Sequence, residues 1–152
     1  MHLQNLTRPE LIFSELPGTD GPTVLRALAE RVAAIAPQLE ADNLYHRLLE
    51  REALSSTGIG DGVAIPHCKL QRLDNVLMAV GLSSEPVEFG AIDNKPVRLF
   101  FLVASPEKQP AEHLKALSSL SRWLKTDHHV DRMLELSAAE EIFRLLAESE
   151  ED

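Results

Sequence analysis

The six histidines of this 152-residue chain are the side chains best suited to chemistry near neutral pH, because neutral imidazole is a good nucleophile with an ordinary pKa of about 6.5. One of them, His67, follows three alternate glycines and a short apolar run that ends at Pro66. Glycine lets a backbone turn tightly and approach a ligand. Two cations, Arg51 and Lys69, lie nearby in the sequence. Such an arrangement is one way to present an imidazole to a phosphoryl group.

Attack of the His67 ring on a phosphoryl group would give a phosphohistidine, whose phosphoryl oxygens need hydrogen-bond donors. The backbone amides of residues 58–62 and the Arg51 guanidinium are candidate donors. A structural histidine at the end of a strand explains the same spacing equally well. The residue pattern leaves both interpretations open.

Three further histidines lie in or after a predicted helix. His113 falls one turn into that helix, where the N-terminus favours anionic ligands. A half-buried histidine that completes a leucine stripe is the simpler interpretation for this position, and the pattern alone favours it. His128 and His129 follow the end of the same helix, close to Lys125. Because cations there complement the helix dipole, we predict a capping role for both.

Other kinds of site have little support in the sequence. His67, Cys68, His113, His128 and His129 are possible zinc ligands, but their spacing matches no zinc motif. The Gly-x-Gly-x-Gly run is neither a dinucleotide fingerprint nor a phosphate-binding P-loop. We therefore expect no metal and no cofactor. A Cys68 nucleophile with His113 as its base stays open, although no other signal of a thiol enzyme supports it.

Composition narrows the class of protein. The length fits one domain, and the 44% hydrophobic content excludes wholesale disorder. Twenty-four acidic and 15 basic residues give a net charge of −9, which argues against nucleic-acid binding. A single cysteine fits a reducing cytosol. The N-terminus lacks a signal peptide and the apolar runs are too short to span a bilayer, so we predict a cytoplasmic protein that is not embedded in a membrane.

Hydrophobic periodicity predicts alternating helices and strands. A helix opens near Gly21 and ends at Pro37, a second has Asp42 as its cap, a long one starts near Pro110, and a capping box at 137–140 opens the last.

The predicted strands are 63–65, 76–82 and 97–104. The last is almost uniformly apolar, as expected of a central strand covered on both faces. This order indicates a single layered α/β domain over residues 1–152, with a mixed sheet and a frayed acidic tail at 148–152.

Several of these segments together resemble a known family. Arg51-Glu52 and the run from Ser56 to His67 are similar to the signature of the fructose/mannitol-type IIA components of the bacterial phosphoenolpyruvate-dependent phosphotransferase system. The resemblance continues through residues 89–97, 103–106 and 113–121, so it covers nearly the whole chain. It implies a mixed β-sheet flanked by helices on both sides and a phosphotransferase component that works as a histidine phosphocarrier.

The resemblance also implies roles for individual residues. His67 matches the phosphoryl-accepting histidine, His113 a second active-site histidine, and Arg51 the arginine beside the phosphoryl group. The phosphoryl donor would be a phosphorylated HPr-like carrier, itself charged by an enzyme I that uses phosphoenolpyruvate. The loop residues expected to contact the phosphoryl group are Thr57, Gly58, Gly60 and Gly62.

Within the family, residues 91–97 resemble the nitrogen-regulatory branch more than the sugar-transport branch, in which glycine is expected at the Asn94 position. The implied partners are regulatory targets such as potassium-transport components or sensor kinases. One alternative is a sugar-transport IIA component that passes phosphate to a IIB partner. Another is a regulatory module that binds a phosphorylated ligand without a covalent bond. Cys68 departs from the glycine or alanine familiar at its position, and its oxidation is a hypothetical obstacle to docking.

Overall fold

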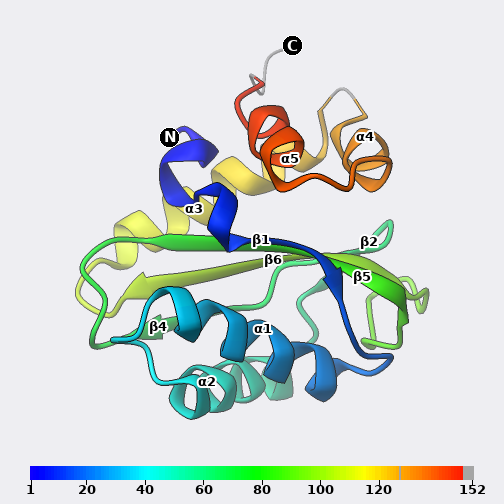
Figure 1. The fold of residues 1–152 in the computed structure, drawn as a ribbon. Coiled ribbons are helices and arrows are strands. Elements are labelled where there is room, and N and C mark those ends of the chain that lie inside the picture. The colour runs from blue at the N-terminus through cyan, green and yellow to red at the C-terminus, as the bar shows by residue number, and fades with distance from the viewer. Residues whose placement is uncertain (127, 149–152) are drawn as a thin grey trace.

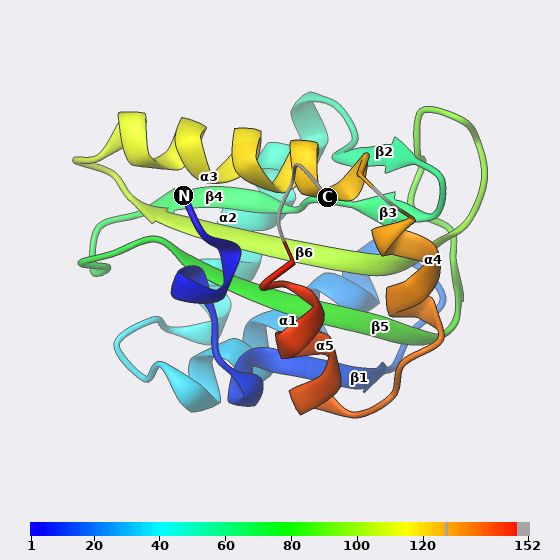
Figure 2. The same cartoon turned by 90° about the horizontal axis from the view of Figure 1, so that it is seen from above.

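A mixed sheet of six strands forms the middle layer of the protein, with helices on both of its faces. The computed structural model describes residues 1–126 and 128–148. Helices α1 (Gly21–Ile35) and α2 (Ala41–Leu54) cover one face, whereas α3 (Pro110–Leu124), α4 (His129–Leu134) and α5 (Ala139–Leu145) cover the other (Figures 1 and 2). The predicted fold class is confirmed.

The sheet contains three predicted strands and three that the sequence did not reveal. Its strands are β1 (Ile12–Leu16), β2 (Gly58–Gly60), β3 (Val63–Ala64), β4 (His67–Leu70), β5 (Leu77–Val87) and β6 (Val97–Pro106). Two 3₁₀ turns, Leu3–Leu6 and Pro9–Leu11, precede β1. The strand order is β1-β5-β6-β3-β2, with β4 also paired to β6.

Strand β6 is the centre of the fold, antiparallel to β5 and parallel to β3 and β4. All of its residues except Arg98 are buried. Alternate side chains enter two separate cores, as the pleat of a strand requires. The core beneath α1 and α2 receives Phe100, Leu102 and Ala104. The core beneath α3 and α5 receives Leu99, Phe101 and Val103.

Strands β3 and β4 lie one after the other along the same edge of β6. Val63 pairs with Leu99, and His67 pairs with Val103. Pro66 separates the two strands, so the predicted strand does end there, but the chain returns to the sheet at His67. Among the described residues β4 pairs only with β6. The strand that begins with His67 is therefore an edge strand.

The helices on the first face begin differently from one another. Asp20 caps α1 by accepting a hydrogen bond from the Thr23 amide at 2.8 Å. The N-cap of α2 is Glu40, whose side chain makes no capping bond. Asp42 lies inside the first turn and pairs with Arg26 across 2.5 Å. The prediction that Asp42 caps α2 is therefore wrong, because the helix begins one residue before it.

The last helix lacks the capping box predicted at 137–140. Its N-cap is Ala138, which has no side-chain acceptor, and the helix begins at Ala139. Ser137 thus precedes the cap position, and the prediction is wrong by one residue. In the acidic tail, Glu148 forms a pair of hydrogen bonds with Arg132 at 2.8 and 2.6 Å. Residues 149–152 of the tail lie outside the described residues.

Helix α4 was not predicted, and it begins at one of the two histidines expected to cap α3. His129 is buried, stacks on the Trp123 ring with centroids 4.2 Å apart, and hydrogen-bonds through Nδ1 to the Trp123 carbonyl at 2.8 Å. Since that carbonyl lies in the last turn of α3, the capping role of His129 is confirmed. His128 is exposed and lies 3.7 Å from Asp131 instead, so its predicted capping role is wrong.

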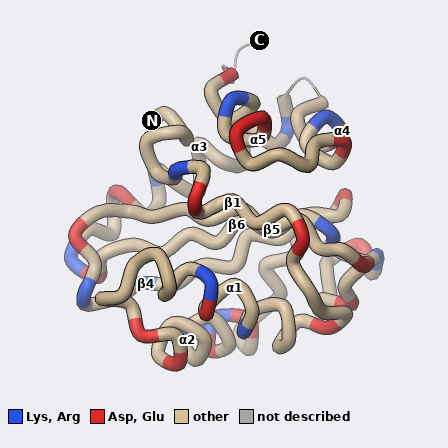
Figure 3. The backbone as a smooth tube through the Cα atoms, in the orientation of Figure 1, with Lys and Arg blue, Asp and Glu red and all other residues tan. Residues whose placement is uncertain are grey.

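Charged residues lie mainly on the helices, in the loops and near the ends of strands, and the middle of the sheet has almost none (Figure 3). This distribution follows from the burial of both faces of the sheet, since an unpaired charge is very unfavourable in a core. Among the described residues, no helix combines the length and the apolar character that crossing a bilayer requires.

Candidate functional site

His67 is the first residue of β4, and its ring is held in one tautomer. Its Nδ1 lies 2.7 Å from the Ile65 carbonyl oxygen. A carbonyl can only accept a hydrogen bond, so Nδ1 is the protonated nitrogen and Nε2 has the free electron pair. The backbone is fixed as well, because the Val103 amide donates to the Pro66 carbonyl at 2.9 Å. The half-buried ring therefore presents Nε2 as a nucleophile.

Arg51 contacts that nitrogen from the last turn of α2. Its Nε donates to Nε2 of His67 at 3.2 Å, and its Nη1 donates to the Ser55 carbonyl at 2.9 Å. The second bond satisfies a carbonyl at the end of α2, where a cation also complements the helix dipole. Two fixed contacts thus orient a guanidinium beside the nucleophile, in a geometry suited to phosphoryl oxygens.

His113 reaches the same place from the first turn of α3. Its side chain is buried, and its ring centroid lies 5.5 Å from that of His67, with the planes inclined by 49°. Its Nδ1 lies 2.6 Å from the Ser105 hydroxyl oxygen on β6. The structure therefore brings together the three predicted residues Arg51, His67 and His113.

Both imidazoles are neutral at pH 7. Burial lowers the pKa of His67, the Arg51 charge lowers it further, and the bond to the Ile65 carbonyl partly opposes them. Burial lowers the pKa of His113 to about 4, together with the positive charge that His67 acquires when it is protonated and the charge of Lys69. Each ring consequently has one N–H and one free electron pair under physiological conditions.

The two histidines open into a cavity of about 550 Å³ at the edge of the sheet. The edge position explains how helices from opposite faces, α2 and α3, can both reach β4. Arg51 and Lys69 supply positive charge to its walls. Two of its lining leucines are unusually exposed, Leu54 at 80% and Leu114 at 66%. An accessible imidazole surrounded by exposed leucine side chains is well placed for contact with another protein.

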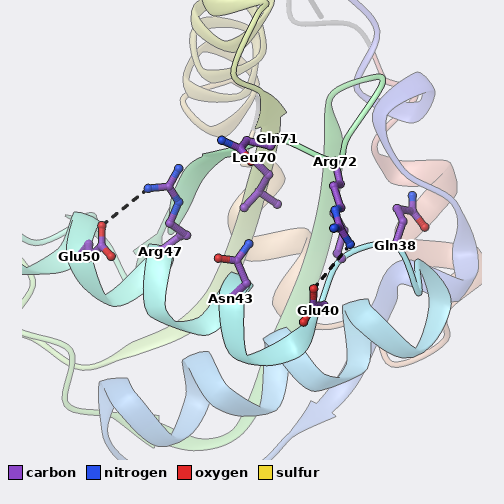
Figure 4. A pocket seen from close by; sticks show the side chains of 9 residues that line it. Gln38, Glu40, Asn43, Arg47, Glu50, Leu70, Gln71 and Arg72 are labelled. Atoms are coloured by element: carbon purple, nitrogen blue, oxygen red, sulfur yellow. Dashed lines mark ion pairs between the residues drawn. The ribbon is translucent and has the colours of Figure 1, made fainter.

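A second, polar hollow of about 480 Å³ adjoins this cavity along α2 (Figure 4). Arg47 and Glu50 line both hollows. Arg47 lies 3.9 Å from Glu50 and 2.6 Å from Glu107. Arg47 is thus already engaged in ion pairs. The hydrogen-bond partners of Arg51, in contrast, are the neutral His67 ring and the Ser55 carbonyl.

The glycine loop, residues 57–62, does not line the cavity that holds His67, contrary to the sequence-based expectation. The Thr57 amide donates to Glu52, and the Gly58 amide donates to the Ser56 hydroxyl at 3.0 Å. Gly60 and Gly62 flank the turn between β2 and β3. Val63 and His67 pair with residues of β6 that are four positions apart, or about 13 Å. None of the four loop residues lines the cavity, so this placement does not support direct phosphoryl contacts from them.

The loop instead fixes the segment that leads to His67. The Glu52 carboxylate accepts from both the amide and the hydroxyl of Thr57, and the Thr57 carbonyl accepts from the Ile65 amide at 2.9 Å. A Cβ on Gly58 would lie 2.7 Å from that of Ala91, so only glycine fits there. Sequence reasoning missed Glu52 as a positioning residue, although it stands next to Arg51 in the motif.

Cys68 is buried, and burial raises the pKa of its thiol to about 12. Since the thiolate is the reactive form, this argues against the alternative of a Cys68 nucleophile with His113 as its base. It also gives no support to the hypothesis that oxidation of Cys68 obstructs docking. In the described part of the chain, no group of three or more metal-ligating side chains occurs.

Comparison with known proteins gives a consistent family. Residues 5–149 match the family model described as phosphoenolpyruvate-dependent sugar phosphotransferase system, EIIA 2. A nitrogen regulatory protein of Bradyrhizobium diazoefficiens is 34% identical over 97% of this chain and 95% of its own length. A fructose-specific EIIA component from Haloferax volcanii is 31% identical over 96% of this chain and 95% of its own.

Among solved structures, the nitrogen regulatory protein IIA-Ntr from Neisseria meningitidis has the same fold. It superposes with a TM-score of 0.87 and 28% identity, over 95% of this chain and 98% of that one. The similarity therefore extends over nearly the whole of both chains.

Proposed function

Because the chain belongs to the EIIA 2 family of the phosphoenolpyruvate-dependent sugar phosphotransferase system, we propose that His67 accepts a phosphoryl group from a phosphorylated HPr-like carrier. The phosphorylated protein then acts as a nitrogen-regulatory signal. One observation carries the proposal. Nε2 of His67 has a free electron pair, faces an arginine at 3.2 Å, and opens into an accessible cavity.

The transfer requires little more than positioning. The electron pair of His67 Nε2 forms a new bond to phosphorus, the phosphorus–nitrogen bond of the donor breaks, and the donor ring keeps that electron pair. Exchange between two imidazoles is nearly thermoneutral, so orientation decides the rate. Positive charge develops on the His67 ring during attack, and the Ile65 carbonyl at Nδ1 stabilises it. Arg51 then donates to the phosphoryl oxygens instead of to Nε2.

The exposed leucines indicate the surface on which the phosphoryl donor docks. Leu54 and Leu114 come from α2 and α3 and stand on the rim of the cavity that holds His67. The donor must bring its own imidazole into that cavity, so its contact surface includes apolar groups around the phosphohistidine. Phosphorylation adds about two negative charges to a chain of net charge −9. That change alters which targets the same surface binds, such as potassium-transport components or sensor kinases.

The nitrogen-regulatory branch is supported by relatives with that name over nearly their full lengths. Asn94 has φ 59°, a left-handed conformation that both glycine and asparagine adopt readily. The backbone therefore accommodates the residue of either branch at this position. The sugar-transport alternative, which the fructose-specific relative represents, is tested by offering the phosphorylated protein a purified IIB component. Rapid loss of phosphate to IIB would favour sugar transport.

The central experiment mixes the protein with phosphoenolpyruvate, enzyme I and the HPr-like carrier and follows its intact mass. We expect the mass gain of one phosphoryl group in an adduct that is acid-labile and alkali-stable. His67→Ala should abolish the gain, whereas His46→Ala, which removes an exposed histidine of α2, should leave it unchanged. Phosphorylation of His67→Ala would contradict the assignment. Binding of a phosphorylated ligand without any covalent adduct would instead favour the non-covalent module.

A further inference from the structure

The two histidines of the site are each bonded through Nδ1, but to groups of different chemistry. Nδ1 of His67 meets the Ile65 carbonyl oxygen, which can only accept a hydrogen bond. Nδ1 of His113 meets the Ser105 hydroxyl at 2.6 Å, and a hydroxyl can donate or accept. The direction of this second bond decides which nitrogen of His113 carries the proton.

The surroundings of Ser105 favour donation by the hydroxyl. Ser105 lies on β6, opposite Lys69 of β4, and is completely buried. Within the described residues, the hydrogen bond found for its hydroxyl is the one to His113. If Nδ1–H donated to Ser105, the hydroxyl proton would be buried without an acceptor, which is unfavourable. If the hydroxyl donates to Nδ1, its proton is satisfied and the ring proton resides on Nε2.

We propose that Ser105 is a positioning residue that holds His113 as the Nε2–H tautomer. The proposal deepens the proposed function, on which it rests. The two imidazoles then have opposite roles: His67 offers an electron pair to phosphorus, and His113 offers a proton to a phosphoryl oxygen.

Opposite tautomers prevent competition between the rings. With centroids 5.5 Å apart, two free Nε2 electron pairs would both be candidates to attack the incoming phosphorus. A protonated Nε2 on His113 cannot attack. It adds a second donor to that of Arg51, because α3 and α2 reach the site from opposite faces of the sheet, and developing negative charge on the phosphoryl oxygens needs such donors.

The direct test is ¹⁵N nuclear magnetic resonance of the imidazole nitrogens in the unphosphorylated protein at pH 7.5. We expect His67 to show a protonated Nδ1 and His113 a protonated Nε2. A protonated Nδ1 on His113 in the unmodified chain would overturn the proposal. This measurement needs no phosphoryl transfer, so its outcome is separate from that of the proposed function, which fails only if His67 is not phosphorylated.

A matched pair of variants isolates the hydroxyl. Ser105→Thr and Ser105→Val have nearly the same shape and both suit a strand, but only threonine retains the donor. We expect Ser105→Thr to keep the Nε2–H tautomer, and Ser105→Val to shift His113 towards a mixture and to slow transfer to His67 about tenfold relative to Ser105→Thr. Equal tautomer populations in the two variants would contradict the proposal. Should Ser105→Val not fold, Ser105→Ala serves in its place, with the same expectation and the same contradicting result.

A control pair addresses the loss of a buried hydroxyl in general. Ser83 on β5 is also buried, and its hydroxyl donates to the Glu85 carbonyl at 2.6 Å. Ser83→Thr and Ser83→Val should transfer phosphate at the same rate and leave both histidine tautomers unchanged. A difference between the Ser83 variants as large as that between the Ser105 variants would show a general packing effect and overturn the positioning role.

Discussion

Nε of Arg51 donates to Nε2 of His67 at 3.2 Å, so the nitrogen that we propose attacks phosphorus is hydrogen-bonded before any phosphoryl group arrives. This contact must break during transfer, while the bond from Arg51 to the Ser55 carbonyl can persist. In the transfer that we propose, the guanidinium moves from the nucleophile to the phosphoryl oxygens without leaving the site. The same side chain would then orient the free ring and stabilise the phosphorylated one.

Replacement of Arg51 should slow transfer far more than it affects folding. Arg51→Ala is expected to lower the single-turnover rate of phosphorylation about 100-fold, the usual effect of losing one donor to developing charge. Arg51→Lys should recover only part of the rate, because an ammonium lacks the forked geometry. Rapid-quench kinetics with the phosphorylated carrier measures both. Arg31→Ala on α1 is the control, and a rate for Arg51→Ala within threefold of that control would refute the role.

The pH dependence of transfer should reflect the lowered pKa of His67. Because burial lowers that pKa below 6.5, with a further contribution from Arg51, the neutral nucleophile persists in mildly acidic solution. We expect the rate to fall to half of its neutral-pH value only below pH 6.5. Removal of the cation in Arg51→Gln should move the half-point upwards. A half-point at or above pH 6.5 in the unmodified protein would be inconsistent with this environment.

His113 should make the fold sensitive to acid. Its pKa is lowered from 6.5 to about 4, so the unfolded chain binds a proton at a higher pH than the folded one. The contribution of His113 to the free energy of unfolding is fully present above pH 6.5. It decreases by about 3 kcal/mol as pH falls to 4. Urea unfolding from pH 7 to 4 should therefore show a smaller loss for His113→Gln than for the unmodified protein. His46→Gln, at an exposed site, should show the unmodified loss; equal losses in all three proteins would exclude the effect.

The contact between Glu52 and Thr57 should contribute to stability. Glu52→Ala leaves the buried amide and hydroxyl of Thr57 without their acceptor, which should lower the free energy of unfolding by about 1–3 kcal/mol. Glu52→Gln keeps an acceptor oxygen and should lose less. Denaturant unfolding of the two variants provides the comparison. The interpretation fails if alanine and glutamine are equally destabilising.

The exposed leucines should affect binding of the donor and not the chemical step. We expect the double variant Leu54→Ser and Leu114→Ser to raise KM for the phosphorylated carrier several-fold and to leave kcat nearly unchanged, because both side chains are mostly exposed in the free protein. Ile92→Ser removes another exposed apolar side chain, at 75% exposure, and lies outside the lining of the cavity. An equal rise in KM for Ile92→Ser would argue against a specific docking surface.

Much of the fold could be predicted because its longer elements have clear periodicity. The helix from Gly21 and the uniformly apolar strand at 97–104 are both observed, since burial on one or both faces leaves a distinct pattern. The strands missed are short or contain glycine, as β2 does. The strand at His67 was hidden because Pro66 was interpreted as a stop, whereas it only separates two strands that pair with the same neighbour.

The main residues of the candidate site could be predicted from the sequence, but their hydrogen bonds could not. The family resemblance brought Arg51, His67 and His113 together, although periodicity alone favoured a packing role for His113. The loop amides were expected to contact phosphate because alternate glycines often do so. Side chains already accept hydrogen bonds from some of them, as Ser56 does from the Gly58 amide and Asp93 from the Asp61 amide. No sequence pattern reveals which acceptor a given amide bonds to. Ser105 was missed for the same reason, since its partner lies on another element.

The edge position of β4 has a consequence for solubility. A strand with an open side can pair with the edge of another molecule and begin aggregation, yet this edge must stay uncovered so that a partner can reach His67. The strand is only four residues long, follows a proline, and presents the exposed cation Lys69 at its centre. Each of these features discourages addition of a foreign strand. Lys69 therefore disfavours association of this edge with strands of other molecules, in addition to lining the cavity. The edge can then stay accessible to a partner without promoting aggregation.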